Sequence, residues 1–129
     1  MVDDDPADAL LVRRAFDKLN ASIMMEHMSD GARALARLRR SDLRRPDLIL
    51  LDLNMPGISG LEFLKTLRAD PVLLALPVVV LSTSNDPKDI HDAYLEYANS
   101  YVQKPTDLST FTKIVQDIGH FWSDVALIP

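Results

Sequence analysis

Apolar residues along this chain alternate between short unbroken runs and longer segments with helical spacing. Two runs dominate, over residues 48–51 and 78–81, and each ends directly at a polar residue. Strands that are apolar on both faces are typical of parallel sheets covered by helices on both sides. The pattern therefore predicts an α/β domain with a doubly wound parallel sheet.

Aspartates mark the starts of three predicted helices. Asp5-Pro6 and Asp86-Pro87 each place a capping side chain before a proline at the first helical position. Asp107 caps the last predicted helix without a proline. The other elements follow from the spacing of apolar residues: helices over residues 32–43 and 61–67, and strands over residues 23–28, 47–52, 78–81 and 101–102.

The first strand is short in this sequence. Only Met1 and Val2 precede the acidic triplet Asp3-Asp4-Asp5, whereas a central parallel strand normally needs about five residues. We therefore expect a truncated first strand, which a segment upstream of Met1 would complete.

Length, charge and cysteine content narrow the class of protein. The chain has 129 residues, enough for one domain, and a net charge of −5, which argues against nucleic acid as the main partner. It has no cysteine, which excludes thiol redox chemistry and zinc–thiolate sites. Its apolar runs are far shorter than the ~20 residues of a membrane helix, and no signal peptide precedes the acidic segment. A cytoplasmic protein is the expectation.

Acidic residues follow two of the predicted strands. Asp52 comes directly after residues 48–51, and Asp3 and Asp4 come directly after the short first strand. The carboxyl ends of neighbouring parallel strands meet at one edge, where open α/β sheets bind ligands. Converging acids repel each other unless a cation neutralises them, so a Mg²⁺ site is predicted. An aspartate beside such a cation is also a candidate nucleophile for phosphorus.

Four segments, each at a strand end, together resemble the receiver domains of two-component response regulators. They cover residues 2–5, 52–60, 80–83 and 104–105. The resemblance implies a flavodoxin-like five-stranded sheet of order 2-1-3-4-5. We assign residues 1–120 to this receiver domain and residues 121–129 to an apolar tail.

The resemblance also implies roles for individual residues. Asp52 accepts a phosphoryl group from a histidine kinase, and Ser82 and Lys104 contact that group. Tyr101 turns inward when Ser82 moves, and the Lys104–Pro105 peptide bond is cis. The implied Mg²⁺ ligands are Asp4 and Asp52 directly, Asp3 through water, and the backbone carbonyl of Asn54. The chain is then a signalling protein and no enzyme beyond its own phosphotransfer and autodephosphorylation.

The tail suggests a narrower group. Residues 119–129 and 81–86 resemble the stand-alone, phytochrome-associated response regulators. That likeness implies a phytochrome-type histidine kinase upstream, no output domain, and a homodimer through the fourth helix, fifth strand and fifth helix. Apolar residues on the last helix span roughly 140° at about 100° per residue, more than a core-facing stripe needs. The expected interface residues are Tyr94, Tyr97, Phe111, Phe121 and Trp122.

The sequence is also compatible with two other functions. A Mg²⁺-dependent phosphohydrolase with an aspartyl intermediate would want a second acid two residues after the nucleophile, where this chain has Asn54. A receiver-like dimerisation scaffold would need no phosphorylation. Six arginines between Arg33 and Arg45 are interpreted as a solvated helix face, because no aromatic residues lie among them.

Overall fold

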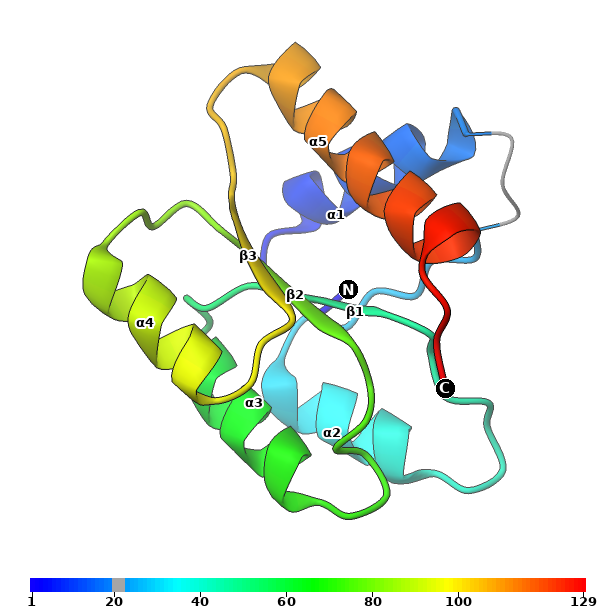
Figure 1. Cartoon of the computed structure of the whole chain (residues 1–129), viewed down its shortest axis with the longest axis vertical. Coiled ribbons are helices and arrows are strands. Elements are labelled where there is room, and N and C mark those ends of the chain that lie inside the picture. The colour runs from blue at the N-terminus through cyan, green and yellow to red at the C-terminus, as the bar shows by residue number, and fades with distance from the viewer. Residues whose placement is uncertain (20–22) are drawn as a thin grey trace.

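The computed structural model describes residues 1–19 and 23–129, and it has three layers (Figure 1). A parallel sheet lies between two groups of helices. The sheet contains β1 (Ile49–Leu51), β2 (Val78–Ser82) and β3 (Ser100–Gln103) in the order β1-β2-β3. The helices are α1 (Pro6–Asp17), α2 (Gly31–Arg39), α3 (Gly60–Ala69), α4 (Pro87–Leu95) and α5 (Leu108–His120). The predicted α/β fold class is confirmed.

Neighbouring residues of the strands pack into opposite halves of the core. Leu50 and Val79 pack with α1 and α5, whereas Leu51 and Val80 pack with α2 and α3. All residues of β1 and β2 are buried, as expected for strands that are covered on both faces. The two helical layers therefore fix which way each strand residue points.

The first strand is reduced to a single residue. Val2 forms isolated parallel bridges to Met28 on one side and to Leu51 on the other. Its backbone N–H donates to the carbonyl of Leu50 at 2.8 Å, and its carbonyl accepts from the N–H of Asp52 at 3.0 Å. These bridges preserve the predicted strand order. Only three regular strands form among the described residues. Val2 alone cannot extend the backbone pairing with the segments of Met28 and Leu51 beyond one residue on each side.

The predicted helix caps are present. The side chains of Asp5, Asp86 and Asp107 each accept a hydrogen bond from a backbone N–H in the first turn of the following helix. The helix expected over residues 32–43 ends earlier, at Arg39. Arg40 adopts an extended conformation with ψ of 118°, and its side chain pairs with Asp42 at 2.6 Å.

The chain beyond α5 continues into a π-helical turn (Phe121–Val125). The backbone N–H of Ala126 donates to the carbonyl of Phe121 at 2.7 Å. Trp122 packs edge-on against the Phe121 ring and against the core beside α1 and α5. Nowhere in residues 1–19 and 23–129 is a helix long and apolar enough to cross a membrane.

Candidate functional site

Three carboxylates meet where β1 and the Val2 bridge end. One oxygen from each of Asp3, Asp4 and Asp52 lies within 4.8 Å of the others. Asp3 and Asp52 are buried, and Asp4 is exposed. The convergence predicted from the sequence is therefore present, although the strand that delivers Asp3 and Asp4 is only one residue long.

Lys104, which follows β3, reaches into this acidic group. Its buried ammonium donates to Asp3 Oδ2 at 2.7 Å and to Asp8 Oδ2 at 2.8 Å. The distance to Asp52 Oδ1 is longer, 3.9 Å. Asp8 was not among the residues predicted for the site. Its position three residues after the Asp5 cap is a signal that could have identified it, because the first turn of α1 begins at this edge of the sheet.

Burial and neighbouring charges shift the pKa values of two site residues. Burial raises the pKa of Asp52 to about 6, the charge of Lys104 opposes this rise, and the charge of Asp3 adds to it. Burial alone would lower the pKa of Lys104, but its hydrogen bonds to Asp3 and Asp8 raise the pKa above its ordinary value. The lysine is therefore charged at neutral pH, whereas Asp52 takes up a proton in mildly acidic solution.

Ser82 ends β2 beside the lysine segment. Its side chain is fully buried, and its Oγ accepts a hydrogen bond from the backbone N–H of Ser84 at 3.2 Å. The backbone N–H of Lys104 donates to the carbonyl of Ser82 at 2.7 Å. This bond holds the two residues predicted to contact a phosphoryl group at neighbouring strand ends.

Tyr101 on β3 contacts the loop that follows Ser82. Its hydroxyl donates to the carbonyl of Ser84 at 2.9 Å, and its ring is half-buried against the core. Its backbone N–H donates to the hydroxyl of Tyr94 on α4 at 3.1 Å. Tyr101 thus connects the β2–α4 loop with α4, and its inward turn with Ser82 stays a prediction.

Gly60 allows α3 to begin against the strand end that carries Asp52. A Cβ at Gly60 would overlap the backbone carbonyl of Asp52 and the Cα of Leu53. The backbone N–H of Gly60 also donates to the carbonyl of Leu53 at 3.0 Å. This close approach holds the loop that contains Asn54, whose side chain is exposed and whose role as a metal ligand stays a prediction.

Two expectations from the sequence need correction. The Lys104–Pro105 peptide bond is not cis, and no other cis bond occurs in the part of the chain that the structure describes. Lys104 reaches the carboxylates without one. Phe111 was expected at an interface, but it is only 4% exposed and belongs to the core with α1. It lies on the inner side of α5, so it offers no surface to a partner.

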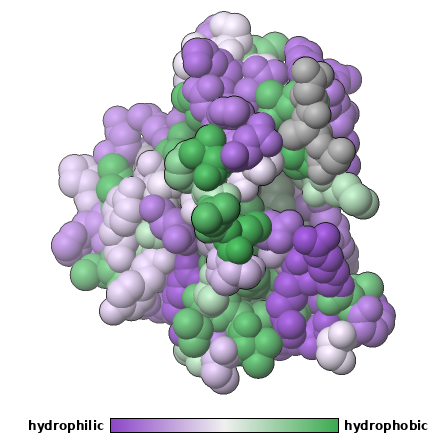
Figure 2. Space-filling model, turned by 45° about the vertical axis from the view of Figure 1, so that its right-hand side comes forward, coloured by the Kyte–Doolittle hydropathy of each residue, from purple (hydrophilic) through white to green (hydrophobic). Residues whose placement is uncertain are grey.

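The other expected interface residues are more accessible. Tyr97 is 74% exposed, Tyr94 and Phe121 are 48% exposed, and Trp122 is half-buried. Figure 2 shows hydrophobic surface among polar side chains on the face that carries the C-terminal end of the chain. This surface is compatible with a contact to another molecule.

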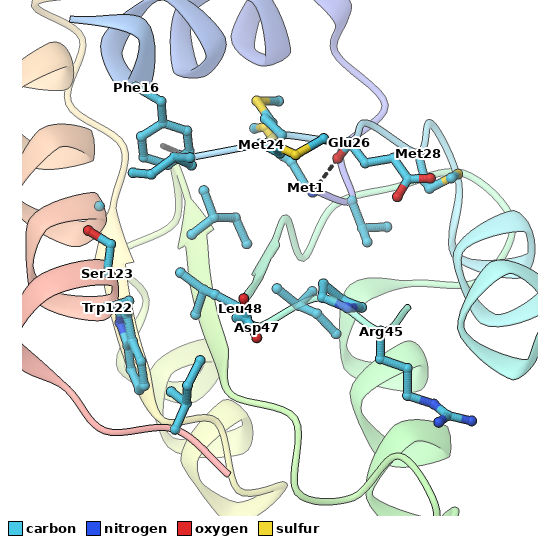
Figure 3. Close-up of a pocket in the computed structure, with 18 of the residues that line it drawn as sticks. Met1, Phe16, Met24, Glu26, Met28, Arg45, Asp47, Leu48, Trp122 and Ser123 are labelled. Atoms are coloured by element: carbon cyan, nitrogen blue, oxygen red, sulfur yellow. Dashed lines mark hydrogen bonds between the residues drawn. The ribbon is translucent and has the colours of Figure 1, made fainter. Parts of the chain in front are cut away.

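A cavity lies away from the acidic site. It has a volume of about 740 Å³ and opens beside the start of β1, at the amino end of the sheet. Figure 3 shows Met24, Met28, Leu48 and Trp122 around it. The N-terminal ammonium of Met1 donates a hydrogen bond to the carbonyl of Glu26 there. Met1 and Val2, at the start of the first strand, are among the residues that line the cavity.

Comparison with known proteins gives consistent matches. The family model described as "Response regulator receiver domain" matches residues 1–116. Response regulator Rcp1 of Synechocystis sp. is 35% identical over 133 residues, which span 100% of this chain and 90% of Rcp1. The probable methanogenesis regulatory protein FilR2 of Methanothrix harundinacea is 36% identical over 125 residues, covering 95% of this chain and 81% of FilR2.

Solved structures match over nearly the whole chain. The phosphorylated cyanobacterial phytochrome response regulator RcpA has a TM-score of 0.95 at 39% identity, covering 99% of this chain and 94% of RcpA. The Mn²⁺-bound form of Rcp1 has a TM-score of 0.93 at 35% identity, covering 99% of this chain and 95% of Rcp1.

Proposed function

Because this chain belongs to the response regulator receiver family, we propose that it is a signalling switch in which Asp52 accepts a phosphoryl group from a sensor histidine kinase. The observation that carries the proposal is the surroundings of Asp52. It is buried at the end of β1, beside the carboxylates of Asp3 and Asp4 and 3.9 Å from the Lys104 ammonium. Phosphoryl transfer asks a protein mainly for such positioning and charge stabilisation.

The donor set of the acidic cluster fits a divalent cation. Asp3, Asp4 and Asp52 offer three hard oxygen ligands within 4.8 Å of one another, and we assign this site to Mg²⁺, which prefers carboxylate oxygen and retained water. The proposed direct ligands are Asp4, Asp52 and the backbone carbonyl of Asn54, and Asp3 is proposed to hold the cation through water. When bound, the cation supplies positive charge that offsets the carboxylates and the phosphoryl oxygens.

Three side chains have separate roles in the proposed phosphoryl transfer. A carboxylate oxygen of Asp52 attacks the phosphorus of a phosphohistidine, the nitrogen–phosphorus bond breaks, and the histidine nitrogen keeps the electron pair. The ammonium of Lys104 offsets charge on the phosphoryl oxygens. The hydroxyl of Ser82 donates to one of them, and its Oγ also accepts from the backbone N–H of Ser84. Water later hydrolyses the acyl phosphate and resets the switch.

The proposed readout follows from the contacts of Ser84. Phosphorylation adds roughly 1.5–2 negative charges at Asp52, which favours conformations that bring Ser82 closer. Ser84 accepts from the Tyr101 hydroxyl through its carbonyl and donates to Asp89 of α4 through its own hydroxyl at 2.6 Å. A shift at Ser82 therefore reaches Tyr101 and α4 through one residue.

Incubation with a radiolabelled small phosphodonor and Mg²⁺ tests the assignment. We expect acid-stable, base-labile label on the wild-type protein and none on Asp52→Ala, because an acyl phosphate needs this carboxylate. Asp47→Ala, which removes an exposed carboxylate near the other end of β1, is the matched control and should label as the wild type does. Full labelling of Asp52→Ala would contradict the proposal.

The similarity to RcpA, a cyanobacterial phytochrome response regulator, supports a more specific proposal for the partners of this chain. We propose a phytochrome-type histidine kinase upstream and a homodimer formed by α4, β3, α5 and the tail at residues 121–129. The exposed side chains of Tyr94, Tyr97 and Phe121 support such a contact. The kinase assignment is testable by light-dependent phosphotransfer from a purified phytochrome kinase to this chain.

A further inference from the structure

Lys104 is shared unequally among three carboxylates. Its Nζ lies 2.7 Å from Asp3 and 2.8 Å from Asp8, within hydrogen-bonding distance, but 3.9 Å from Asp52. We propose that Asp8 is a positioning residue that restrains Lys104 in the unphosphorylated protein, and that the lysine leaves Asp8 for the phosphoryl group on Asp52. This inference rests on the proposed function of Asp52.

The contact between Asp8 and Lys104 is tertiary. The two residues are 96 positions apart in the chain, and their side chains are only 24% and 6% exposed. A carboxylate in the first turn of α1 would also favour the helix by opposing its dipole. That local role does not need a lysine from the end of β3, so the ion pair is an additional feature.

Exchange of the lysine is easier from Asp8 than from Asp3. Asp3 is 1% exposed and its Oδ1 also accepts from the backbone N–H of Asp5 at 2.9 Å. Asp8 is more exposed, so solvent can replace the lysine at its carboxylate when that bond breaks. A lysine ammonium has three donors on a flexible stem, and it can therefore keep Asp3 while exchanging Asp8 for a phosphoryl oxygen.

Asp8 also adds negative charge to the site. The group already contains Asp3, Asp4 and Asp52 around a single lysine, and the incoming phosphoryl group is itself anionic. Removal of the Asp8 carboxylate should therefore leave Lys104 closer to Asp52 and weaken the repulsion of the donor. The Asp8 carboxylate would therefore lower the rate at which Asp52 is phosphorylated.

Measurement of the initial labelling rate with a small phosphodonor tests whether Asp8 slows the phosphorylation of Asp52. We expect Asp8→Asn and Asp8→Ala to label roughly three- to fivefold faster than the wild type, the scale of a partly exposed ion pair. Asp17→Asn, which removes an exposed carboxylate from the same helix, controls for net charge and should leave the rate unchanged. Asp8→Glu, which keeps the charge, should label at close to the wild-type rate.

A second measurement reports on the lysine itself. The ¹⁵N resonance of the Lys104 side chain, followed in the unphosphorylated protein, should move in Asp8→Asn and not in Asp17→Asn. Unchanged or slower labelling by both Asp8 variants, or an unmoved lysine resonance, would overturn the proposal. Labelling that persists in Asp52→Ala would instead refute the function of Asp52, so the two failures are distinguishable.

Discussion

Asp52 combines two requirements that conflict in the absence of a cation. A nucleophilic carboxylate must be ionised, but burial between Asp3 and the strand end favours its protonated form and raises its pKa to about 6. Lys104 offsets only part of this effect, because its two hydrogen bonds go to other carboxylates. A bound cation would favour the ionised form, so metal binding and activation of Asp52 are linked.

The raised pKa predicts how stability depends on pH without metal. The unfolded chain releases the Asp52 proton near pH 3.8, and the native protein releases it near pH 6. Between these values the native state binds more protons, so the contribution of Asp52 to the free energy of unfolding falls as pH rises. Above pH 6 the full destabilisation is present, and below pH 3.8 it is absent.

Asp52→Asn should therefore be more stable than the wild type in chelator at about pH 7.5, by about 1–3 kcal/mol. Urea unfolding would measure this difference. Near pH 4 the two proteins should have similar stability, because Asp52 is then largely protonated in the native state. Saturating Mg²⁺ at pH 7.5 should reduce or reverse the order, and a difference that grows towards low pH would contradict the argument.

Gly60 offers a second test at the level of one residue. Because a Cβ there would overlap the backbone of Asp52 and Leu53, Gly60→Ala should lower the free energy of unfolding by about 2–4 kcal/mol. Gly57→Ala is the matched control. Gly57 has a φ of 75° but open space around a Cβ, so it should lose only about 1 kcal/mol. Equal losses in denaturant unfolding would show that the close approach is not needed.

Among the elements, the helices follow local signals and the strands depend on neighbours. The N-terminal ends of α1, α4 and α5 coincide with capping aspartates, because a cap is formed within a few residues. The segment 23–28 has no comparable local determinant. It pairs only at Met28, where Val2 offers its backbone.

This dependence predicts the effect of lengthening the first strand. Three apolar β-branched residues added ahead of Met1 should extend the pairing of Val2 and occupy part of the cavity of about 740 Å³ beside Leu48. Burial of each side chain contributes about 1.5–3 kcal/mol, against about 1–2 kcal/mol for ordering its backbone. We expect a net gain of about 2 kcal/mol in the free energy of unfolding.

Denaturant unfolding of the extended chain is the measurement, and an extension of Ser-Gly-Ser is the control. The polar extension has no apolar area to bury in the cavity, so it should leave stability unchanged. The same stability for both extensions would mean that the strand does not continue along β1.

At the scale of the whole molecule, we expect the protein to form a dimer through its exposed apolar side chains. Phe121→Glu should weaken the proposed dimer, because it places a charge in the tail where an aromatic ring is 48% exposed. Leu74→Glu is the control, since this leucine is also 48% exposed but lies in the connector between α3 and β2. Sedimentation at tens of micromolar, the scale of a weak interface, should show loss of dimer only for Phe121→Glu.

A wild-type protein that stays monomeric under these conditions would contradict the proposed interface. Dimerisation of both variants would place the contact elsewhere on the surface. Repeating the measurement with phosphodonor would show whether phosphorylation of Asp52 affects association, as the path through Ser84 and Tyr101 to α4 suggests.

Patterns in the sequence were sufficient to predict β1, β2 and β3, the starts of α1, α4 and α5, and the acids at the strand ends. These features depend on runs of apolar residues and on caps such as Asp5, and both are local. Three features became evident only from the packing of the elements: Asp8 and Asp3 share Lys104, Phe111 faces inward, and the first strand pairs at Val2 alone. Each of these depends on how separate elements pack and on which neighbours are present, and that information is not contained in any one segment.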